Sequence, residues 1–286
     1  MLPWLHPEPH DWWSVVELAL AEDIGSGDLS SASLPAELLA DWYIEVQADG
    51  ILAGLGIAAH LMQPEDDDPP SCDLEVLAQD GDVVRRGDVV IRGRLPASAV
   101  LSAERTALNF MMQLSGVATL TRKFVDSVAG TSARVVDTRK TVPGLRALQK
   151  YAVRCGGGFN HRMGLYDGVM LKDNHIAAHG SVAKAITAAR RVASHLIRIE
   201  VECENAAQVE EAVAAGADVV MLDNMDPFMM REVVKQFGDR VLLEASGGIN
   251  LDTVRGVAQT GVHLISVGAI THSAPALSMH LELKSR

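Results

Sequence analysis

The stretch VECENAAQVEEAVAAGADVVMLDN (residues 201–224) contains one unit of the pattern that decides the fold. A short apolar run ends at Glu202, the amphipathic helical pattern AAQVEEAVAAG follows it, and a second apolar run begins at Val219. A buried strand, a helix and another buried strand within this length predict a βαβ unit with parallel strands.

The same unit recurs in both directions along the chain. Apolar, β-branched runs begin near Arg134, Val169, Ile197, Val219, Val241 and His263, and the last three intervals are 22 residues each. Helical patterns separate the last five runs. This rhythm favours a parallel sheet, folded either as a β/α barrel or as a doubly wound sheet.

Polar residues follow each apolar run, and their position favours the barrel. In a β/α barrel the carboxyl ends of the strands converge on one face, where such enzymes place their sites. The strand ends contain Asp137–Lys140, Lys172–His175, Glu200 and Glu202, Asp223–Asn224, Glu244 with Ser246–Gly248, and Gly268. Six strands are fewer than the eight of a full barrel, so either the barrel is incomplete or further strands lie in the 35-residue interval after Arg134.

The part of the chain before Arg134 is predicted to be a mixed α/β region. A helix is expected to start with Asp11 as its N-cap, a strand alternates from Trp42, and a long helix runs from about Ser102 to Ala129. The doublet GDVVRRGDVV (81–90) predicts a hairpin of two short strands.

Charge is distributed unevenly along the 286 residues. The net charge of −12 argues against a nucleic-acid binder or an anionic-membrane binder. Residues 137–175 nevertheless hold seven cations and three acids, a local charge of +4, while the remaining 18 basic and 34 acidic residues leave −16. Clustered cations predict a pocket for a small, strongly anionic ligand, with a solvated basic face as the alternative.

Cysteine use and the first residues bear on the compartment. Cys72, Cys155 and Cys203 are an odd number without a CxxC motif, which is typical of reduced thiols in a cytoplasmic protein. The start MLPWLHPEPHDWW lacks a basic, apolar leader, so no signal peptide is expected. The uncharged run 262–281 contains three histidines and a proline, which a bilayer span would not tolerate.

Four glycine-rich or basic motifs suggest ligand contacts, although each also fits an ordinary loop. Arginine and lysine in DTRK (137–140) suit a carboxylate or a phosphate. The glycines of RCGGGFNHR (154–162) allow close approach to a ligand, and SGGIN (246–250) and VGAITHS (267–273) resemble phosphate loops after late barrel strands. The chain has no Walker A, HExxH or GxSxG motif.

Two carboxylates, Glu202 and Asp223, lie 21 residues apart and are therefore expected on neighbouring strand ends. Such a pair suits ribose hydroxyls or a Mg²⁺ ion shared with pyrophosphate. Charge balance for Lys140 and Lys172 is an equally compatible interpretation.

Taken together, the quoted motifs and the blocks EDIGSGDLSS (22–31), ERTALNFMMQLSGVAT (104–119), HRMGLYDGVMLKDNH (161–175) and VVMLDNMDP (219–227) resemble the quinolinate phosphoribosyltransferase family. These are decarboxylating enzymes of NAD biosynthesis, and the match extends in order over nearly the whole chain. One departure from the family pattern is Gly248, where many relatives carry asparagine.

The resemblance implies a two-domain α/β fold. Residues 1–115 would form an N-terminal α/β sandwich domain to which 275–286 return, and 116–274 an incomplete (open) β/α barrel of parallel strands. It also implies a homodimer, or a higher oligomer built on it, with shared active sites, in which Arg105 reaches the partner's site.

The resemblance further implies the site residues of a pentosyltransferase. Quinolinate would be bound by Arg105, Thr138, Arg139, His161, Arg162 and Lys172. Phosphoribosyl pyrophosphate would be bound by Lys140, Glu202, Asp223, Ser246, Gly247, Gly248, Val267, Gly268 and Ala269. The catalytic set would be Lys140, Lys172, Glu202 and Asp223, with Mg²⁺ held mainly by the pyrophosphate and by Glu202 and Asp223.

The implied reaction transfers the phosphoribosyl group to the quinolinate nitrogen with loss of CO₂, giving nicotinate mononucleotide and pyrophosphate. Three alternatives compete with it: a molybdenum-transport-associated homologue of the same fold with another substrate, a non-catalytic protein that binds quinolinate or a nucleotide, and another phosphate-binding barrel enzyme. The intact HRMGLYDGVMLKDNH run and the full arginine set argue against the homologue. Every expected polar position is filled, which argues against the non-catalytic protein, and the third alternative leaves the paired arginines unexplained.

Overall fold

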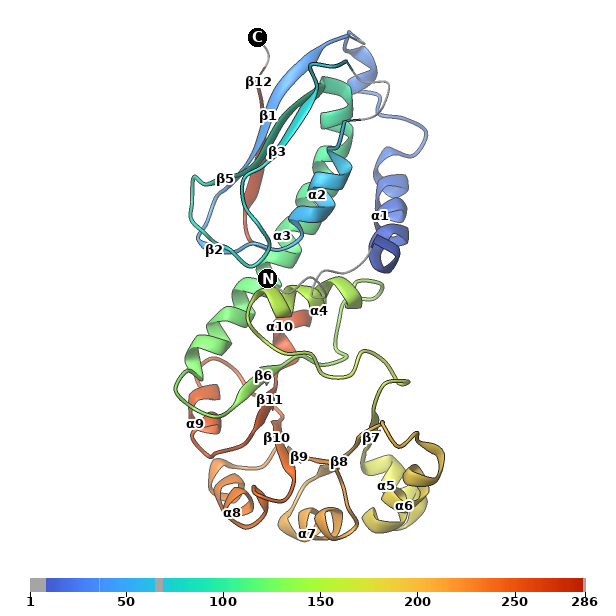
Figure 1. Cartoon of the computed structure of the whole chain (residues 1–286), viewed down its shortest axis with the longest axis vertical. Coiled ribbons are helices and arrows are strands. Elements are labelled where there is room, and N and C mark those ends of the chain that lie inside the picture. Colours follow the sequence, from blue (N-terminus) through green and yellow to red (C-terminus); the bar gives the residue numbers. More distant parts are fainter. Residues whose placement is uncertain (1–8, 36, 65–68, 285–286) are drawn as a thin grey trace. The chain divides into compact units, whose positions relative to one another are not determined.

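The computed structural model describes residues 9–35, 37–64 and 69–284. Contacts between the described residues divide the chain into two units (Figure 1). The first unit comprises residues of 1–122, 142–157 and 273–286, and the second comprises 123–141 and 158–272. Among the described residues, no helix combines the length and the apolar composition that a bilayer span requires.

The second unit is built on a sheet of six parallel strands in the order β6-β11-β10-β9-β8-β7. All six predicted apolar runs are strands, at most two residues from the expected starts. Their bounds are β6 Arg134–Val136, β7 Val169–Leu171, β8 Ile199–Cys203, β9 Val219–Asp223, β10 Leu242–Ser246 and β11 Leu264–Ser266.

The sheet is an open barrel, as predicted. Its end strands β6 and β7 share no ladder in the described chain, and β6 is instead extended by a single bridge between Val136 and Phe159. Helices cover the outer side of the curved sheet (Figure 1). These are α5 Asp173–His179, α6 Val182–Val192, α7 Ala206–Ala214, α8 Pro227–Phe237 and α9 Val254–Ala258, and the short α10 Ala269–His272 follows β11.

Local capping explains why these helices start where they do. The side chains of Ser181, Asn205 and Asp226 accept hydrogen bonds from backbone N–H groups at the first turns of α6, α7 and α8. In α8, Pro227 occupies the first helical position, where its missing N–H is no loss.

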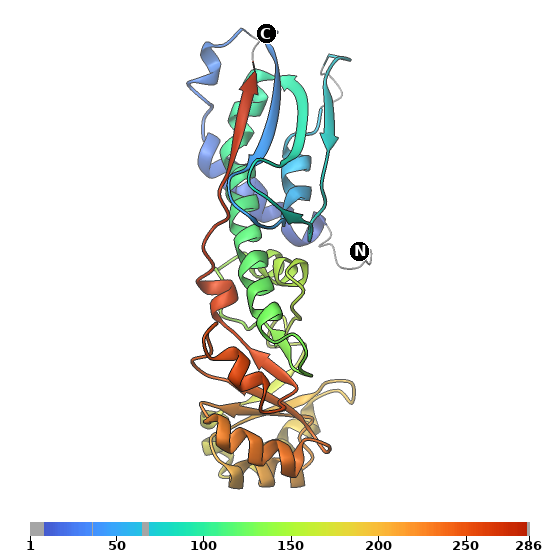
Figure 2. The same ribbon diagram turned by 90° about the vertical axis from the view of Figure 1, so that its left-hand side faces the viewer.

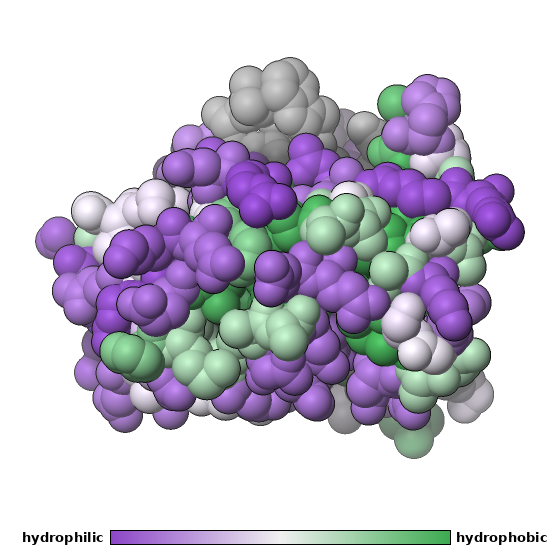
Figure 3. Space-filling view, turned by 90° about the horizontal axis from the view of Figure 1, so that it is seen from below, coloured by the Kyte–Doolittle hydropathy of each residue, from purple (hydrophilic) through white to green (hydrophobic). Residues whose placement is uncertain are grey.

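Seen from the end where α7 and α8 lie in Figure 1, the surface is mostly hydrophilic with interspersed apolar side chains (Figure 3).

The first unit contains a four-stranded antiparallel sheet in the order β12-β1-β5-β3. Alternation in β1 directs Ala40, Trp42, Ile44 and Val46 into the core, as expected for a sheet with one covered face. The C-terminal strand β12 lies along β1 (Figure 2). The bounds are β1 Leu39–Val46, β3 Asp73–Val76, β5 Val89–Pro96 and β12 Met279–Lys284.

The helices of this unit are α1 Pro9–Ile24, α2 Leu55–Leu61, α3 Ala97–Ser127 and α4 Arg146–Cys155, with a 3₁₀ turn at Ser31–Ser33. The predicted N-cap at Asp11 is wrong, because α1 already begins at Pro9 and Asp11 lies inside it. The long helix predicted from about Ser102 is confirmed as α3, which buries Leu108 and Met111 in the core of the unit.

The predicted hairpin at 81–90 is also wrong. Its first strand, β4 (Val83–Val84), pairs with β2 (Gly50–Ile51), whereas its second strand is the start of β5 and pairs with β1. The tight turn is present, since Asp88 N–H donates to Arg85 O at 3.0 Å. Val46 N–H, however, bonds to Asp88 O, so pairing with β1 diverts the chain from a local hairpin.

Helix α4 belongs to the first unit, although the sequence division assigned 116–274 to the barrel. The Tyr151 hydroxyl donates to Asp80 Oδ2 at 2.8 Å, and the same carboxylate accepts from the N–H groups of Gly54 and Leu55 at the start of α2. Burial, followed by the charge of Asp80, raises the pKa of Tyr151 above its usual range. One buried carboxylate thus connects α4 to α2.

Candidate active site

A pocket of about 340 Å³ lies in the second unit at the carboxyl ends of the barrel strands. It brings together nine of the predicted site residues from six separate stretches of sequence. These are Thr138, Arg139, Lys140, His161, Arg162, Lys172, Glu202, Asp223 and Ser246.

The end of β6 is held by a buried carboxylate. Asp137 is fully buried and accepts hydrogen bonds from His161 N–H at 2.9 Å and from Asn160 Nδ2 at 2.6 Å. Thr138 Oγ1 accepts from Lys140 N–H at 3.0 Å and turns the chain after the strand. Arg139 and Lys140 are therefore presented at the pocket by a loop that is fixed to the 160–161 segment.

Lys140 is positioned by close backbone contact. Its carbonyl oxygen accepts a hydrogen bond from Thr271 Oγ1 at 2.8 Å. A Cβ atom at Gly268 would lie 3.0 Å from Lys140 Cδ and 3.2 Å from the His272 ring, so glycine makes room for the lysine side chain. The predicted loop of Val267, Gly268 and Ala269 thus adjoins Lys140, although none of the three lines the pocket.

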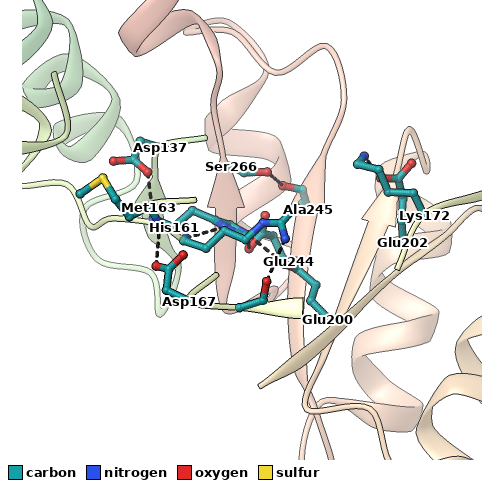
Figure 4. Close-up of polar contacts among 12 residues, drawn as sticks. Asp137, His161, Met163, Asp167, Lys172, Glu200, Glu202, Glu244, Ala245 and Ser266 are labelled. Atoms are coloured by element: carbon teal, nitrogen blue, oxygen red, sulfur yellow. Dashed lines mark hydrogen bonds and ion pairs between the residues drawn. The ribbon is translucent and has the colours of Figure 1, made fainter. Parts of the chain in front are cut away.

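Two carboxylates and a lysine stand on the neighbouring ends of β7, β8 and β9. Lys172 Nζ forms an ion pair with Glu202 Oε2, with side chains 47% and 15% exposed (Figure 4). Asp223 Oδ2 accepts from Asn224 Nδ2 at 2.7 Å, and Asn224 N–H donates to Ser246 O at 2.9 Å. Gly247 lies against Asn224, and Gly248 follows it on the exposed side of the loop.

Arg162 lies beside a second guanidinium. Its Nη1 donates to Gly168 O at 2.8 Å. Partial burial, followed by repulsion from Arg139, lowers the pKa of Arg162 from its ordinary value. The pocket contains four cationic side chains and three carboxyl groups, namely Arg139, Lys140, Arg162 and Lys172 with Glu202, Asp223 and Glu244.

The other cations of the basic segment 137–175 lie outside the pocket. Arg146, Lys150 and Arg154 lie on α4 in the first unit, so only part of the local +4 charge belongs to the pocket. Arg105 lies on α3 in the first unit, where its side chain is 58% exposed and lies 3.5 Å from Glu104 Oε1. It is not among the residues that line this pocket.

Sequence reasoning named Glu200 and Glu244 at the strand ends, but it did not recognise that the pocket has an inner layer. Met170, Met221, Glu244 and Ser266 line it, and each stands two residues before a strand-end residue. Glu200 stands in the same way two residues before Glu202. Since alternate residues of a strand face the same side, this i, i+2 spacing was a usable signal. Burial, followed by the charge of Glu200, raises the pKa of Glu244 to about 8.

The inner layer also borders a second cavity of about 460 Å³. His161, Arg162 and Glu244 line both cavities. The other residues that line the second cavity include the first residues of five strands, Arg134, Val169, Val219, Leu242 and Leu264. The inner layer thus separates the two ends of the barrel.

The fold and the site together define a class: an open β/α-barrel enzyme that binds a small, strongly anionic substrate at its strand ends. Comparison with known proteins gives the family. Residues 117–282 match the family model described as quinolinate phosphoribosyl transferase, C-terminal domain, and residues 28–115 match its N-terminal domain. The chain belongs to the quinolinate phosphoribosyltransferase family.

Individual relatives agree over almost the full length. A Bacillus subtilis protein named probable nicotinate-nucleotide pyrophosphorylase [carboxylating] is 45% identical, over 92% of this chain and 90% of its own. A protein of the same name from Synechocystis is 41% identical over 98% and 94%. The solved nicotinate-nucleotide pyrophosphorylase of Francisella tularensis is 36% identical and superposes with a TM-score of 0.92, covering 98% of each chain.

Proposed function

We propose that the chain transfers the 5-phosphoribosyl group of phosphoribosyl pyrophosphate to the ring nitrogen of quinolinate, with loss of CO₂. The products are nicotinate mononucleotide and pyrophosphate, in the synthesis of NAD. The observation that carries the proposal is the pocket itself, where four cations and three carboxyl groups meet in the barrel of a chain of this family. The names of the full-length relatives favour this reaction over a molybdenum-transport-associated homologue.

Each substrate would occupy its own part of the pocket. For the two carboxylates of quinolinate the pocket offers the planar guanidinium groups of Arg139 and Arg162 and the ammonium group of Lys172. Thr138 and His161 lie beside them. Lys140, Glu202, Asp223 and Ser246 surround the place for phosphoribosyl pyrophosphate. The loops at 247–248 and 267–269 follow β10 and β11 and would supply backbone N–H groups for phosphate, except that of Val267, which donates to Val136 O.

Catalysis by this arrangement needs no protein nucleophile. The pyridine nitrogen attacks the anomeric carbon as the bond to pyrophosphate breaks, and the developing positive charge on the ribose is stabilised by Glu202 and Asp223. The bond between the ring and the 2-carboxylate then breaks, CO₂ leaves, and the electron pair stays on the ring carbon beside the quaternised nitrogen. Lys140 or Lys172 supplies the proton that this carbon takes up.

A magnesium ion fits the carboxylate pair. Glu202 and Asp223 provide the hard oxygen donors that Mg²⁺ prefers, and both line the pocket. One Asp223 oxygen is used by Asn224, while Glu202 pairs with Lys172, so the protein offers few ligands and the pyrophosphate would supply the others. When bound, the ion neutralises charge on the leaving pyrophosphate.

The proposal includes a homodimer with shared sites, in which Arg105 serves the pocket of the partner. Arg105 supports it, since an exposed guanidinium with one long contact at 3.5 Å is available for a ligand. Arg105→Ala and Lys172→Ala are each expected to be inactive alone. Mixed after subunit exchange, they should recover about a quarter of the wild-type activity, because half of the dimers then hold one intact site. No recovery after exchange verified by mass spectrometry contradicts sharing.

A cytoplasmic location completes the proposal. It is supported by the three cysteines, since no disulfide joins any of them and two, Cys155 and Cys203, are buried in the described chain. Burial raises the pKa of each of these two thiols to about 12, so both remain protonated and inert.

The deciding assay combines purified protein, quinolinate, phosphoribosyl pyrophosphate and Mg²⁺, and follows nicotinate mononucleotide and CO₂ together. Nicotinate as the acceptor is the control, because it lacks the 2-carboxylate. Equal amounts of both products from quinolinate, and none from nicotinate, are expected. A folded protein that binds quinolinate without forming product would contradict the proposal and favour a binding protein.

A further inference from the structure

Two buried carboxylates in the barrel have no part in the proposed reaction. Glu200 on β8 and Glu244 on β10 have side chains that are only 7% and 1% exposed. One oxygen of each, Oε1, is buried without a hydrogen-bond partner. Buried carboxylates are costly unless they are paired or protonated, so their presence behind the pocket requires a reason.

Both carboxylates point to the ring of His161 (Figure 4). His161 Nε2 lies 2.8 Å from Glu200 Oε2 and 3.8 Å from Glu244 Oε2. On the other side of the ring, Nδ1 accepts a hydrogen bond from the backbone N–H of Arg162 at 2.7 Å. Both ring nitrogens of His161 are therefore engaged within the protein.

These contacts fix the tautomer of the ring. A nitrogen that accepts a hydrogen bond carries no proton, so the proton of a neutral His161 must be on Nε2. From there it is donated to Glu200 Oε2, which is the nearer carboxylate oxygen. A doubly protonated ring would place an N–H against the N–H of Arg162.

The same geometry excludes this cluster as a metal site, although His161, Glu200 and Glu244 have potential ligand atoms within 4.8 Å of one another. A metal on Nε2 would require the ring proton to move to Nδ1. That position faces the Arg162 N–H.

We propose that Glu200 is a positioning residue for the substrate dicarboxylate: it holds His161 as the Nε2–H tautomer, and His161 in turn fixes the backbone of Arg162. The proposal rests on the proposed function, since Arg162 is a ligand of quinolinate in it. Glu244 Oε2 lies 3.8 Å from the same ring nitrogen and supports Glu200 from a neighbouring side. His161 thereby becomes a structural link between Glu200 and Arg162 rather than a direct ligand of the substrate.

Arg162 has two further supports that make this link effective. Asp137 accepts from the N–H of His161 at 2.9 Å, and Arg162 Nη1 donates to Gly168 O at 2.8 Å. With the backbone held at His161 and the guanidinium held at Gly168, the ring contact to Arg162 N–H sets the remaining orientation. A guanidinium that binds a carboxylate through two parallel bonds is sensitive to small displacements.

The first test measures ligand binding in two variants of Glu200. Glu200→Gln keeps a carbonyl oxygen that accepts from Nε2–H, whereas Glu200→Leu removes the acceptor. Glu232→Leu on the exposed side of α8 is the matched control. Benzene-1,2-dicarboxylate is the probe for calorimetry, because it has both carboxylates and no ring nitrogen to react.

Loss of the acceptor is expected to weaken dicarboxylate binding about tenfold in Glu200→Leu, with a parallel rise of the quinolinate KM. Glu200→Gln and Glu232→Leu should remain within about twofold of the wild type, and the KM for phosphoribosyl pyrophosphate should not change in any of them. Equal weakening in the Gln and Leu variants, or none in either, overturns the proposal.

The second test is independent of enzyme activity, and it reads the ring protonation in the wild-type protein. Nitrogen-15 NMR of histidine-labelled wild-type protein, with the His161 signals assigned from their loss in His161→Gln, reports which ring nitrogen carries the proton. Protonated Nε2 with bare Nδ1 at pH 7 is expected. The opposite tautomer, or an imidazolium ring, overturns the proposal even if the enzyme assay succeeds, and a failed assay with the expected tautomer counts against the proposed function alone.

Discussion

Two layers of the same barrel differ in burial and in what their polar groups do. The rim layer, at the strand ends, contains Lys140, Lys172, Glu202 and Asp223, whose charges face a pocket and are partly exposed. The inner layer, two residues deeper, contains Glu200 and Glu244, which are buried around His161. The charges of the rim layer are therefore available to ligands. The buried carboxyl groups of the inner layer must instead find partners within the protein, and they fix the orientation of the His161 ring.

The largest effect is expected at the rim, from Lys140→Ala. Because Lys140 is proposed to bind phosphoribosyl pyrophosphate, removing its charge should lower kcat by about 10²–10³. Thermal unfolding should be unchanged, because the lysine side chain is exposed. Steady-state kinetics and calorimetry measure the two quantities, with Lys184→Ala on the outer face of α6 as the control. A kcat near that of the wild type would show that Lys140 is not part of the site.

A smaller effect at the rim is expected on the quinolinate KM from Arg139→Lys. This change keeps the positive charge but removes the planar guanidinium with its paired N–H donors. The quinolinate KM should rise about tenfold, since one hydrogen bond to a charged group contributes about 1.5–3 kcal/mol. Arg191→Lys, at an exposed position of α6, should leave the KM unchanged. If Arg139→Lys also leaves it unchanged, Arg139 does not bind the dicarboxylate.

For the inner layer the expected effect is on stability and its pH dependence. Burial raises the pKa of Glu244 to about 8 from an ordinary value of 4.5. Between these values the folded state holds more protons than the unfolded state, so the stability of the wild type falls as pH rises through this window. Above pH 8 the loss is complete, and below pH 4.5 it is absent.

Glu244→Gln cannot ionise and should lack this loss. Relative to the wild type it should gain about 1 kcal/mol in the free energy of unfolding between about pH 6 and pH 7. Urea unfolding at pH 5, 6, 7 and 8 measures the difference, with Glu232→Gln as the exposed control. Parallel pH profiles for wild type and Glu244→Gln would mean that Glu244 is ionised in the folded protein.

The rim layer could be predicted from the sequence, whereas Glu200 and Glu244 of the inner layer could be placed near the strand ends but not given a role. Strand starts and strand ends follow from local periodicity, and this periodicity alone puts Lys172, Glu202, Asp223 and Ser246 on one edge of the sheet. Glu200 and Glu244 have the same period-2 spacing, but a glutamate inside a barrel contradicts the usual preference for burial of apolar residues. Only the contact with His161, 39 residues from Glu200, explains it.

The first unit shows the same limit at the level of the fold. Alternation in β1 predicted its inward face correctly, because one covered face imposes that pattern. The hairpin at 81–90 failed because β5 pairs with β1, more than 40 residues away in sequence. Likewise, no local pattern reveals that Tyr151 bonds to Asp80, which brings α4 into the first unit.

The smallest effect is expected at the loop beyond the rim, from Gly248→Asn. Gly248 has φ +60°, and a Cβ atom there would meet nothing within 4 Å. Asparagine tolerates this left-handed conformation better than most residues, and its amide adds one donor near the phosphates. The KM for phosphoribosyl pyrophosphate should therefore change by less than about threefold.

Gly248→Val separates the contribution of the backbone from that of the side chain. A β-branched residue at this φ is strained, so Val should cost about 1–2 kcal/mol in stability. If Val raises the KM for phosphoribosyl pyrophosphate while Asn does not, the loop binds phosphate through its backbone. If Asn alone raises that KM about tenfold or more, the phosphate occupies the space where the side chain would lie, and the loop belongs to the rim itself.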